Sequence, residues 1–116
     1  MPAQLLEEQI RALYAAFNRR DSSFVTDQMT ADVTWPQAFK GGFVRGPAAV
    51  AAYWKEQWTE IDPDVEPIGI TALDDGRVDV EVHQVVRDLA GNVIADAVVH
   101  HFYRFEGARI AGMELG

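Results

Sequence analysis

The chain has 116 residues, enough for one domain with a real core and too few for two. It is 48% hydrophobic and 24% charged, which is typical of an ordinary globular protein and not of a disordered chain. The formal net charge of −8 argues against nucleic acid or an anionic membrane as a partner, because phosphate groups are bound by clustered Lys and Arg.

The sequence contains no cysteine, which excludes disulfide bonds, thiolate catalysis and cysteine-ligated metals. Residues 1–11 lack the basic patch and apolar run of a secretory signal. No stretch approaches the roughly 20 apolar residues that a bilayer-spanning helix needs. We therefore expect a cytoplasmic location without a membrane partner. Because no repeat or linker interrupts the sequence, residues 1–116 are expected to form one domain.

The first half of the chain predicts three helices. Apolar side chains recur at steps of three and four between Leu6 and Phe17, which places them on one face of a helix. Asp21 can cap a short second helix. Pro47 is suited to begin the third, because proline at the first helical position pre-sets φ. The buried stripe of this third helix is expected to consist of Val50, Tyr53, Trp54, Gln57, Trp58 and Ile61.

The remaining segments predict strands. A short strand at residues 33–35 is followed by Pro36. Four longer strands, separated by turn signals, are expected at residues 65–73, 77–88, 93–106 and 109–115. Three helices followed by such strands predict an α+β domain, with the helices packed on one face of a strongly curved sheet. This packing leaves a cavity between the concave face and the helices.

The two long strands indicate which polar groups face that cavity. Gln84 lies on the apolar face of one strand, and His101 and Tyr103 lie on the apolar face of the next. A two-residue turn at Gly91-Asn92 would pair Gln84 with Val99 and make Gln84 a diagonal neighbour of His101. Polar groups in an apolar wall must be hydrogen-bonded, or each costs about 1–3 kcal/mol. Their partners could be each other, trapped water or a ligand.

His101 is the first candidate for chemistry. It could be a core histidine bonded to a backbone carbonyl, Tyr14 or a buried water. It could also be a general acid/base at the pocket wall, since an imidazole titrates near neutral pH. Gln84 could likewise be a satisfied core residue or a functional one, and its functional role would be to orient a ligand. Aromatic side chains that could line a pocket for an aromatic or polycyclic ligand, or could equally be plain core, are Tyr14, Phe17, Trp35, Tyr53, Trp54 and Trp58.

The histidines do not predict a metal site. His100 and His101 are adjacent in one strand and point to opposite faces, so they cannot share an ion. His83 and His100 would pair on the outer face with Glu81 nearby, but a third ligand and a second shell are missing from the pattern. An outer-face position or a place in a dimer interface explains them better.

Several segments resemble the nuclear transport factor 2-like superfamily. Residues 13–21 are similar to its first-helix signature, and residues 31–35 to the start of its first strand. Residues 46–50 resemble the opening of its third helix, and residues 103–107 its final hairpin. The likeness covers nearly the whole chain and is strongest to the SnoaL-like branch, the polyketide cyclase-like proteins.

This resemblance implies a cone-shaped α+β barrel that forms a homodimer through the outer sheet face and needs no cofactor. It also implies a pocket for a small apolar molecule. Activities of the superfamily include isomerisation, cyclisation and dehydration, and many members are non-catalytic binding or dimerisation modules. In an enzyme acting on a small carbonyl compound, His101 would move the proton, while Gln84 and Tyr14 would hold the oxygen. The other aromatic side chains, Tyr103 included, would contact the apolar body of the ligand.

Three positions bear on which of these activities fits. The ketosteroid isomerases carry a general-base Asp immediately before a proline after the first strand, where this chain has Trp35. Aligning Asn18 places their catalytic tyrosine at Leu13, one residue from Tyr14. Both departures argue against steroid-type isomerase chemistry. The polyketide cyclases use a carboxylate near the chain end, and Glu114 is the nearby acid here, on either face of its strand.

Overall fold

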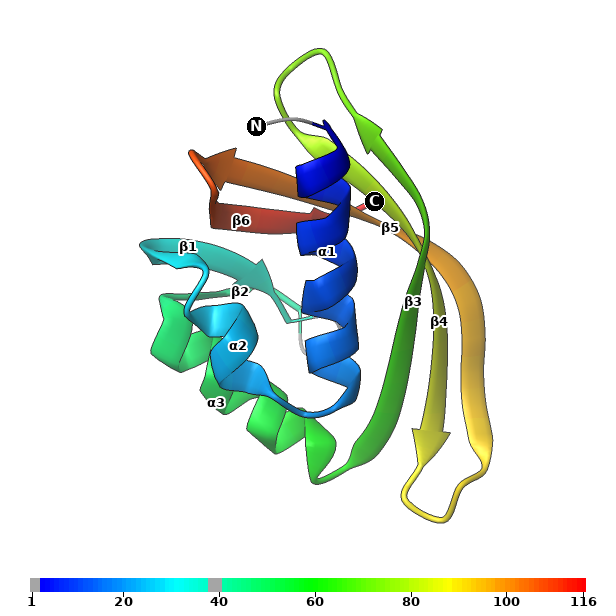
Figure 1. Ribbon diagram of the computed structural model, residues 1–116. Helices are drawn as coiled ribbons and strands as arrows, with labels where there is room; N and C mark the ends of the chain where they lie inside the picture. The colour runs from blue at the N-terminus through cyan, green and yellow to red at the C-terminus, as the bar shows by residue number, and fades with distance from the viewer. Residues whose placement is uncertain (1–2, 38–40) are drawn as a thin grey trace.

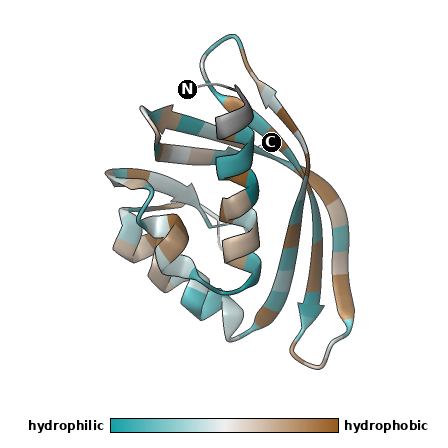
Figure 2. Ribbon diagram, viewed as in Figure 1, coloured by the Kyte–Doolittle hydropathy of each residue, from teal (hydrophilic) through white to brown (hydrophobic). Residues whose placement is uncertain are grey.

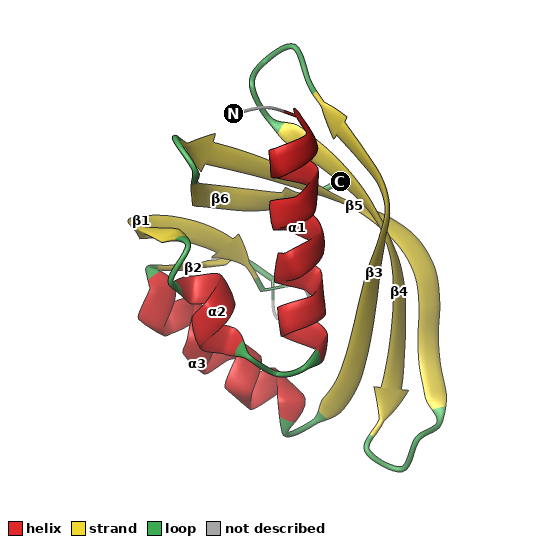
Figure 3. Ribbon diagram, viewed as in Figure 1, coloured by secondary structure: helices red, strands yellow, loops and turns green. Residues whose placement is uncertain are grey.

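The computed structural model describes residues 3–37 and 41–116 and shows an α+β fold (Figures 1 and 3). Its three helices gather on the concave side of one sheet, as predicted. No helix in this described part is long and apolar enough to cross a membrane. In chain order the elements are α1 (Ala3–Asn18), α2 (Ser22–Thr26), β1 (Met29–Pro36), β2 (Phe43–Arg45), α3 (Pro47–Trp58), β3 (Ile61–Ala72), β4 (Val78–Asp88), β5 (Val93–Glu106) and β6 (Arg109–Leu115).

The sheet is mixed and open. Its strand order is β2-β1-β6-β5-β4-β3, with β1 and β6 parallel and every other pair antiparallel. Among the described strands, β2 and β3 are the two edges, so the curved sheet does not close into a complete barrel. The edge position of β3 explains how Pro63 and Pro67 lie within a strand, since an edge can spare two backbone donors.

Local sequence signals account for the helix boundaries, with one exception. The Asp21 carboxylate accepts a hydrogen bond from the Phe24 backbone N–H, 3.4 Å away, and so caps α2. Gly46 precedes α3 with a φ of 90°, and Pro47 is its first residue. The predicted stripe of α3 was one turn too long, because the helix ends at Trp58 and Ile61 already begins β3.

The turn between β4 and β5 differs from the predicted one. The Gly91 N–H donates to the Asp88 carbonyl over 3.0 Å, and the Asp88 N–H donates to the Asn92 carbonyl over 2.8 Å. The loop therefore contains the three residues 89–91 and not the pair Gly91-Asn92. Gly91 has a φ of 94°, the left-handed conformation that a three-residue hairpin loop requires. The Asp88 carboxylate reinforces this loop by accepting from the Asn92 N–H at 2.9 Å.

This loop and a bulge after Val86 shift the pairing of the two long strands by two residues. His101 lies opposite Val80, and Gln84 lies opposite Ala97. An even shift leaves every side chain on its predicted face. Gln84 and His101 are nevertheless four residues apart along the strands, roughly 13 Å at the usual rise. The prediction that they are diagonal neighbours was therefore wrong.

The core fills the space between the helices and the concave sheet face. Hydrophobic and hydrophilic residues alternate along the long strands (Figure 2), so one face of each strand packs inward. Burying an aliphatic side chain of this size contributes about 1.5–3 kcal/mol. The fully buried large side chains are Ile10, Val33, Val50, Val80, Val82, Val86 and Ile110. They come from α1, α3 and three strands, and they fix the helices over the sheet.

Candidate functional site

A cavity of about 90 Å³ lies between the helices and the concave face of the sheet. Its described lining is mainly aromatic and aliphatic, and none of the lining residues in ranges 3–37 and 41–116 is Asp, Glu, Lys or Arg. An apolar cavity of about 150 Å³ is known to hold benzene, so a ring-sized ligand requires some lining side chains to move. The lining residues are Leu13, Tyr14, Phe17, Val25, Trp35, Pro36, Tyr53, Trp54, Gln57, Pro63, Val65, Gln84, His101, Tyr103, Ile110, Met113 and Leu115.

Three hydrogen-bonded side chains form one polar part of this lining. The Tyr14 hydroxyl lies 2.7 Å from Nδ1 of His101 and 2.8 Å from the hydroxyl of Tyr103. His101 and Tyr103 are two residues apart on β5 and therefore share its inner face, while Tyr14 comes from the buried face of α1. We call Tyr14, His101 and Tyr103 the polar trio. Each of the three is buried.

Burial keeps the polar trio uncharged at neutral pH. Desolvation, with a smaller effect from neighbouring His100, lowers the pKa of His101 to about 4. Desolvation also raises the pKa of Tyr14 and of Tyr103 above the usual tyrosine value. His101 is therefore a neutral imidazole, and both tyrosines keep their hydrogens.

One ring nitrogen of His101 is left for a ligand. Nδ1 is bonded to Tyr14, whereas Nε2 makes no hydrogen bond to any residue that the structure describes. A neutral imidazole carries one donor nitrogen and one acceptor nitrogen. Nε2 at the wall of an apolar cavity can thus act either as a base or as a donor, depending on the tautomer.

Gln84 supplies a second polar group at the cavity. It is half-buried on β4, and its amide makes no hydrogen bond to another described residue. Gln57, from α3, lines the same cavity and donates to the Tyr53 hydroxyl over 3.2 Å. Since Gln84 lies well away from His101 along the sheet, the two mark separate polar points on one apolar wall.

Aromatic rings in edge-to-face contact, from α1, α3 and β1, form another part of the wall. Trp35 and Trp54 have ring centroids 5.3 Å apart, as do Phe17 and Trp54. Trp35 also lies 5.9 Å from the ring of Tyr103. Such contacts add about 0.5–1.5 kcal/mol each beyond burial. The wall is thus well packed where it meets the polar trio.

All but one of the predicted site residues line the cavity. His101, Gln84, Tyr14, Trp35, Phe17, Tyr53, Trp54 and Tyr103 do so, and Trp58 does not. The Trp58 ring packs behind the lining against Phe17 and Trp54, with the Arg20 guanidinium 5.2 Å from its centre. Its Nε1 is buried without a hydrogen-bond partner in the described structure.

Some lining residues were missed by the sequence reasoning. Pro36 and Pro63 line the cavity, although the sequence suggested them only as the ends of elements. Met113 and Leu115 face it from β6. The period-two alternation along β6 could have revealed both.

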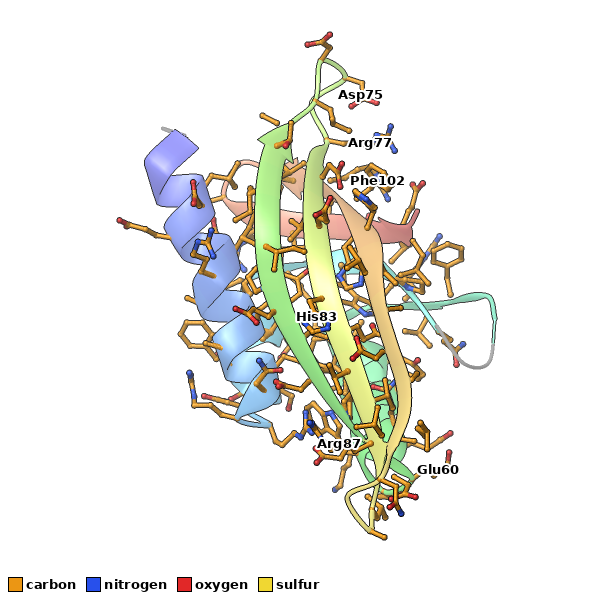
Figure 4. All side chains as sticks on the ribbon, turned by 90° about the vertical axis from the view of Figure 1, so that its right-hand side faces the viewer. Glu60, Asp75, Arg77, His83, Arg87 and Phe102 are labelled. Carbon is orange, nitrogen blue, oxygen red and sulfur yellow. The ribbon has the colours of Figure 1, made fainter. Side chains whose placement is uncertain are left out.

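The outer face of the sheet holds two further histidines, each with a carboxylate. Nε2 of His83 lies 2.7 Å from Asp96, and Nδ1 of His100 lies 2.8 Å from Asp79. Figure 4 looks onto this face and shows His83 on it. The expected pairing of His83 with His100 was wrong, because the shifted register places His83 opposite Val98. No group of three or more possible metal ligands comes together in the part of the chain that the structure describes.

The family is decided by a comparison with known domains. The family model described as the SnoaL-like domain matches residues 10–113. The chain belongs to the SnoaL-like family. This confirms the resemblance to the SnoaL-like branch of the nuclear transport factor 2-like proteins. A pocket for a small molecule fits this SnoaL-like assignment.

Solved structures share the SnoaL-like fold. A nuclear transport factor 2-like protein of unknown function from Burkholderia pseudomallei is 25% identical, with a TM-score of 0.81 over 96% of this chain and 88% of that chain. TerC, co-crystallised with polyporic acid, is 25% identical, with a TM-score of 0.81 over 96% and 89%. A putative polyketide cyclase from Xanthomonas campestris is 25% identical, with a TM-score of 0.78 over 97% and 89%. No curated protein matches the chain.

Glu114 does not reach the SnoaL-like cavity. Its exposed carboxylate lies 3.9 Å from the Arg104 guanidinium. Glu114 pairs with Phe102, whereas the neighbouring pair of Leu115 and His101 faces the cavity. Glu114 is therefore not a counterpart, at this cavity, of the carboxylate that polyketide cyclases use near the chain end. Any proton chemistry there falls to His101 and the tyrosines.

Proposed function

We propose that this SnoaL-like protein is a cofactor-independent enzyme that transfers a proton on a small apolar carbonyl compound. The reaction would be an isomerisation, a cyclisation or a dehydration. One observation carries this proposal: a neutral imidazole, His101, lines an apolar cavity with Nε2 unbonded to any described residue. A neutral imidazole is the form that accepts a proton as a general base.

The other lining residues have distinct roles in this proposal. Tyr14 holds the ring of His101 in place through its 2.7 Å hydrogen bond to Nδ1. Gln84 lies too far along the sheet to bind the same ligand atom as His101, so it would bind a second polar group of the ligand. Trp35 and Trp54 would contact its apolar body. A low-dielectric lining strengthens each of these polar contacts.

Two relatives support a small organic ligand. One was co-crystallised with polyporic acid, and the other is a putative polyketide cyclase, each 25% identical to this chain. Because the same fold serves unrelated activities, these relatives support the ligand class more than the reaction.

A cytoplasmic location stays a prediction.

Deuterium exchange tests the reaction directly. A panel of small apolar ketones, including cyclohexanone, is incubated with the protein in D₂O, and loss of the proton next to the carbonyl is followed by NMR. We expect the protein to accelerate exchange for at least one ketone. His101→Ala should lower that rate by about 10²–10⁴-fold, the usual contribution of a general base. His83→Ala, a matched change on the outer face, should leave it unchanged. Equal exchange with His101→Ala would refute the role of His101.

A non-catalytic ligand-binding module is the second candidate. It is favoured by the hydrogen bonds within the polar trio, which satisfy most of its polar groups as in an ordinary core. This candidate predicts that a ketone binds, seen as shifts of the Trp35 and Trp54 indole signals, without any acceleration of exchange. The exchange experiment therefore separates the two candidates.

We also propose a homodimer formed through the outer face of the sheet. Ile94 and Val98 are 57% and 55% exposed there, and half-buried Phe102 follows at the same four-residue spacing along β5. Asp96 and His100, each part of an imidazole–carboxylate pair, alternate with these apolar side chains along the strand. Such a mixed surface is compatible with an interface, since a non-obligate interface is on average about as apolar as the rest of a protein surface.

A further inference from the structure

The polar trio contains one more hydrogen than its internal hydrogen bonds use. Tyr14, Tyr103 and neutral His101 each carry a single polar hydrogen. Two hydrogen bonds, of 2.7 and 2.8 Å, join the three groups. The third hydrogen has no acceptor among the described residues. Since buried donors are normally satisfied, this hydrogen is available to a molecule in the cavity.

The position of the third hydrogen depends on the direction of the chain of hydrogen bonds. In one arrangement, Nδ1–H of His101 donates to Tyr14, and Tyr14 donates to Tyr103. The Tyr103 hydroxyl is then free to donate into the cavity, and Nε2 is a bare base. In the reverse arrangement, Tyr103 donates to Tyr14, and Tyr14 donates to Nδ1. Nε2 then carries the hydrogen, and the Tyr103 oxygen can accept.

We propose that the polar trio is a proton relay that acts on its ligand from both ends. Nε2 of His101 takes a proton from carbon while the Tyr103 hydroxyl donates one to the carbonyl oxygen of the same molecule. The substrate class is a neutral ketone with a hydrogen on the carbon next to the carbonyl. Tyr103 is then a catalytic residue, and Tyr14 is a positioning residue that passes the proton between them. This inference rests on the proposed function and names the substrate class of the same site.

The proton transfers balance without an oxidant or a reductant. The carbon–hydrogen bond breaks, its electron pair becomes the new carbon–carbon double bond, and its proton goes to Nε2. The Nδ1 proton moves to Tyr14, the Tyr14 proton moves to Tyr103, and the Tyr103 proton forms the O–H of the enol. If the ketone is β,γ-unsaturated, Nε2 then gives its proton to the γ-carbon of the dienol, and the β,γ electron pair forms that carbon–hydrogen bond. The remaining carbon–carbon double bond moves to the α,β position, the C=O bond re-forms, and the enol O–H returns its proton to Tyr103. The Tyr103 proton passes back to Tyr14, and the Tyr14 proton passes back to Nδ1. The product is the conjugated ketone, and the relay is back in its first arrangement.

The surroundings of the polar trio favour this route over a charged intermediate. Burial lowers the pKa of His101 to about 4 and raises the pKa of Tyr14, so an imidazolium or a phenolate is disfavoured. Among the residues that the structure describes, no Asp, Glu, Lys or Arg lines the cavity to balance such a charge. A relay leaves every member neutral before and after the transfer, which avoids the cost of a buried unpaired charge.

The placement of the two ends suits a flat ligand. The rings of His101 and Tyr103 project from the same face of β5, with centroids 6.4 Å apart. Both rings line the cavity, and Trp35 stands against Tyr103 at 5.9 Å. A small ring that enters this cavity, once lining side chains have moved to admit it, would lie against both the imidazole and the phenol.

A third pattern of hydrogen bonds within the polar trio is the alternative that the test must distinguish from the relay. Tyr14 could accept from both neighbours and donate its own hydrogen to the ligand. In that case Tyr103 only supports Tyr14, and the imidazole keeps its hydrogen on Nδ1 whether or not a ligand is bound.

Nitrogen-15 NMR of the full chain reports which nitrogen of His101 carries the hydrogen. The probe is cyclohexanone, with methylcyclohexane as a control of similar size that has no carbonyl. We expect cyclohexanone, and not methylcyclohexane, to increase the Nδ1–H population, because its oxygen accepts from Tyr103. Tyr103→Phe should abolish this response, and His83→Gln, a change on the outer face of the sheet, should preserve it. A response that survives in Tyr103→Phe, a hydrogen that moves to Nε2, or no response in the wild type would overturn the relay.

Kinetics give an independent measure with the conversion of cyclohex-3-enone to cyclohex-2-enone. His101→Gln and Tyr103→Phe should each lower kcat/KM by about 10²–10⁴-fold. The double variant should be no slower than the slower single variant, because residues that act as one unit are not additive. Additive losses, or a small loss in Tyr103→Phe, would contradict the relay.

The two measurements separate the relay from the proposed function. If no ketone reacts while the nitrogen-15 response is present, the hydrogen-bond arrangement with Tyr103 as donor stands as a binding device, and the proton transfer fails together with the catalytic proposal. If exchange occurs without the response, the catalytic proposal stands and the relay fails. Should circular dichroism show that Tyr103→Phe does not fold, the comparison of cyclohexanone with methylcyclohexane in the wild type decides alone.

Discussion

His100 and His101 are neighbours in the chain, yet their surroundings are opposite. His101 is 7% exposed on the concave face and is bonded to a neutral hydroxyl of Tyr14. His100 lies on the outer face, where Asp79 is 2.8 Å away and Glu81 is 3.7 Å away. The hydrogen bond to Asp79 raises the pKa of His100, whereas burial lowers the pKa of His101 to about 4.

This difference follows from strand geometry alone. Successive residues of β5 point to opposite faces, so one step along the chain exchanges an apolar cavity for a surface with carboxylates. The concave face selects neutral polar groups, and the outer face tolerates charged ones. The contrast between the two faces can be tested by introducing the same side chain on both faces. It can also be tested by replacing either histidine or the carboxylate that contacts His100.

The largest effect is expected from placing a carboxylate on each face. Val80 is fully buried opposite His101, and Val98 is 55% exposed on the outer face. Val80→Asp should lower the free energy of unfolding by more than about 4 kcal/mol, because it buries an unpaired charge. Val98→Asp should change it by about 0.5 kcal/mol or less in the monomer. Urea denaturation measures both, and equal losses would show that the faces do not differ as described.

The next effect is the pH dependence of stability. The pKa of His101 is lower in the folded protein than in the unfolded chain, so the unfolded chain binds more protons between about pH 6.5 and pH 4. Stability should therefore fall as the pH falls through this window, by about 3 kcal/mol in total from His101. His100 has a raised pKa, so its contribution is present below pH 6.5 and is lost as the pH rises.

Two variants separate these opposite contributions. In His101→Gln, the loss of stability on acidification should become smaller, and in His100→Gln it should become larger. Thermal unfolding of both variants between pH 4 and pH 8, at one protein concentration, measures the slopes. If both variants change the slope in the same direction, the opposite protonation of the two neighbours is contradicted.

The sequence was sufficient to predict which faces the strands present. Alternation of apolar residues placed Gln84, His101 and Tyr103 on the inner side, and the structure agrees. The limits of β5 and β6 were also predicted correctly, since turns with glycine bound both strands. Face and strand identity depend on local pattern, which a single sequence carries.

The sequence was not sufficient to predict which residues meet across strands. The Asp88 side chain stabilises a three-residue loop, and a bulge follows Val86. Neither feature has a clear local signal in the sequence. The neighbour of His101 therefore changed from Gln84 to Tyr14, one of the three partners that the sequence left open. Trp58 was predicted to line the cavity and does not, for a related reason. Helical spacing indicates which side of α3 is buried, but it does not indicate which ring on that side reaches the cavity.

A smaller effect is expected for the proposed dimer. Val98→Asp would place a carboxylate midway between Ile94 and Phe102 on the outer face of β5. We expect the dissociation constant to rise at least about tenfold, which corresponds to about 1.4 kcal/mol. Leu89→Asp, an equally exposed apolar residue at the hairpin loop, is the matched control and should leave the constant unchanged. Sedimentation measures both variants, and a wild-type monomer at all concentrations would contradict the dimer.

The smallest effect concerns His100 and its carboxylate. Asp79→Asn keeps the shape of the side chain but removes the charge that lies 2.8 Å from Nδ1. The pKa of His100 should then fall towards its ordinary value, because the hydrogen bond to Asp79 is the largest cause of its rise. The pKa of His101 should stay low, since burial is its main cause and Asp79 lies on the other face of the sheet. Proton NMR titration of the imidazole signals resolves the two rings. A large shift of His101 in this variant would mean that the charges of the outer face, more than burial, keep the inner histidine neutral.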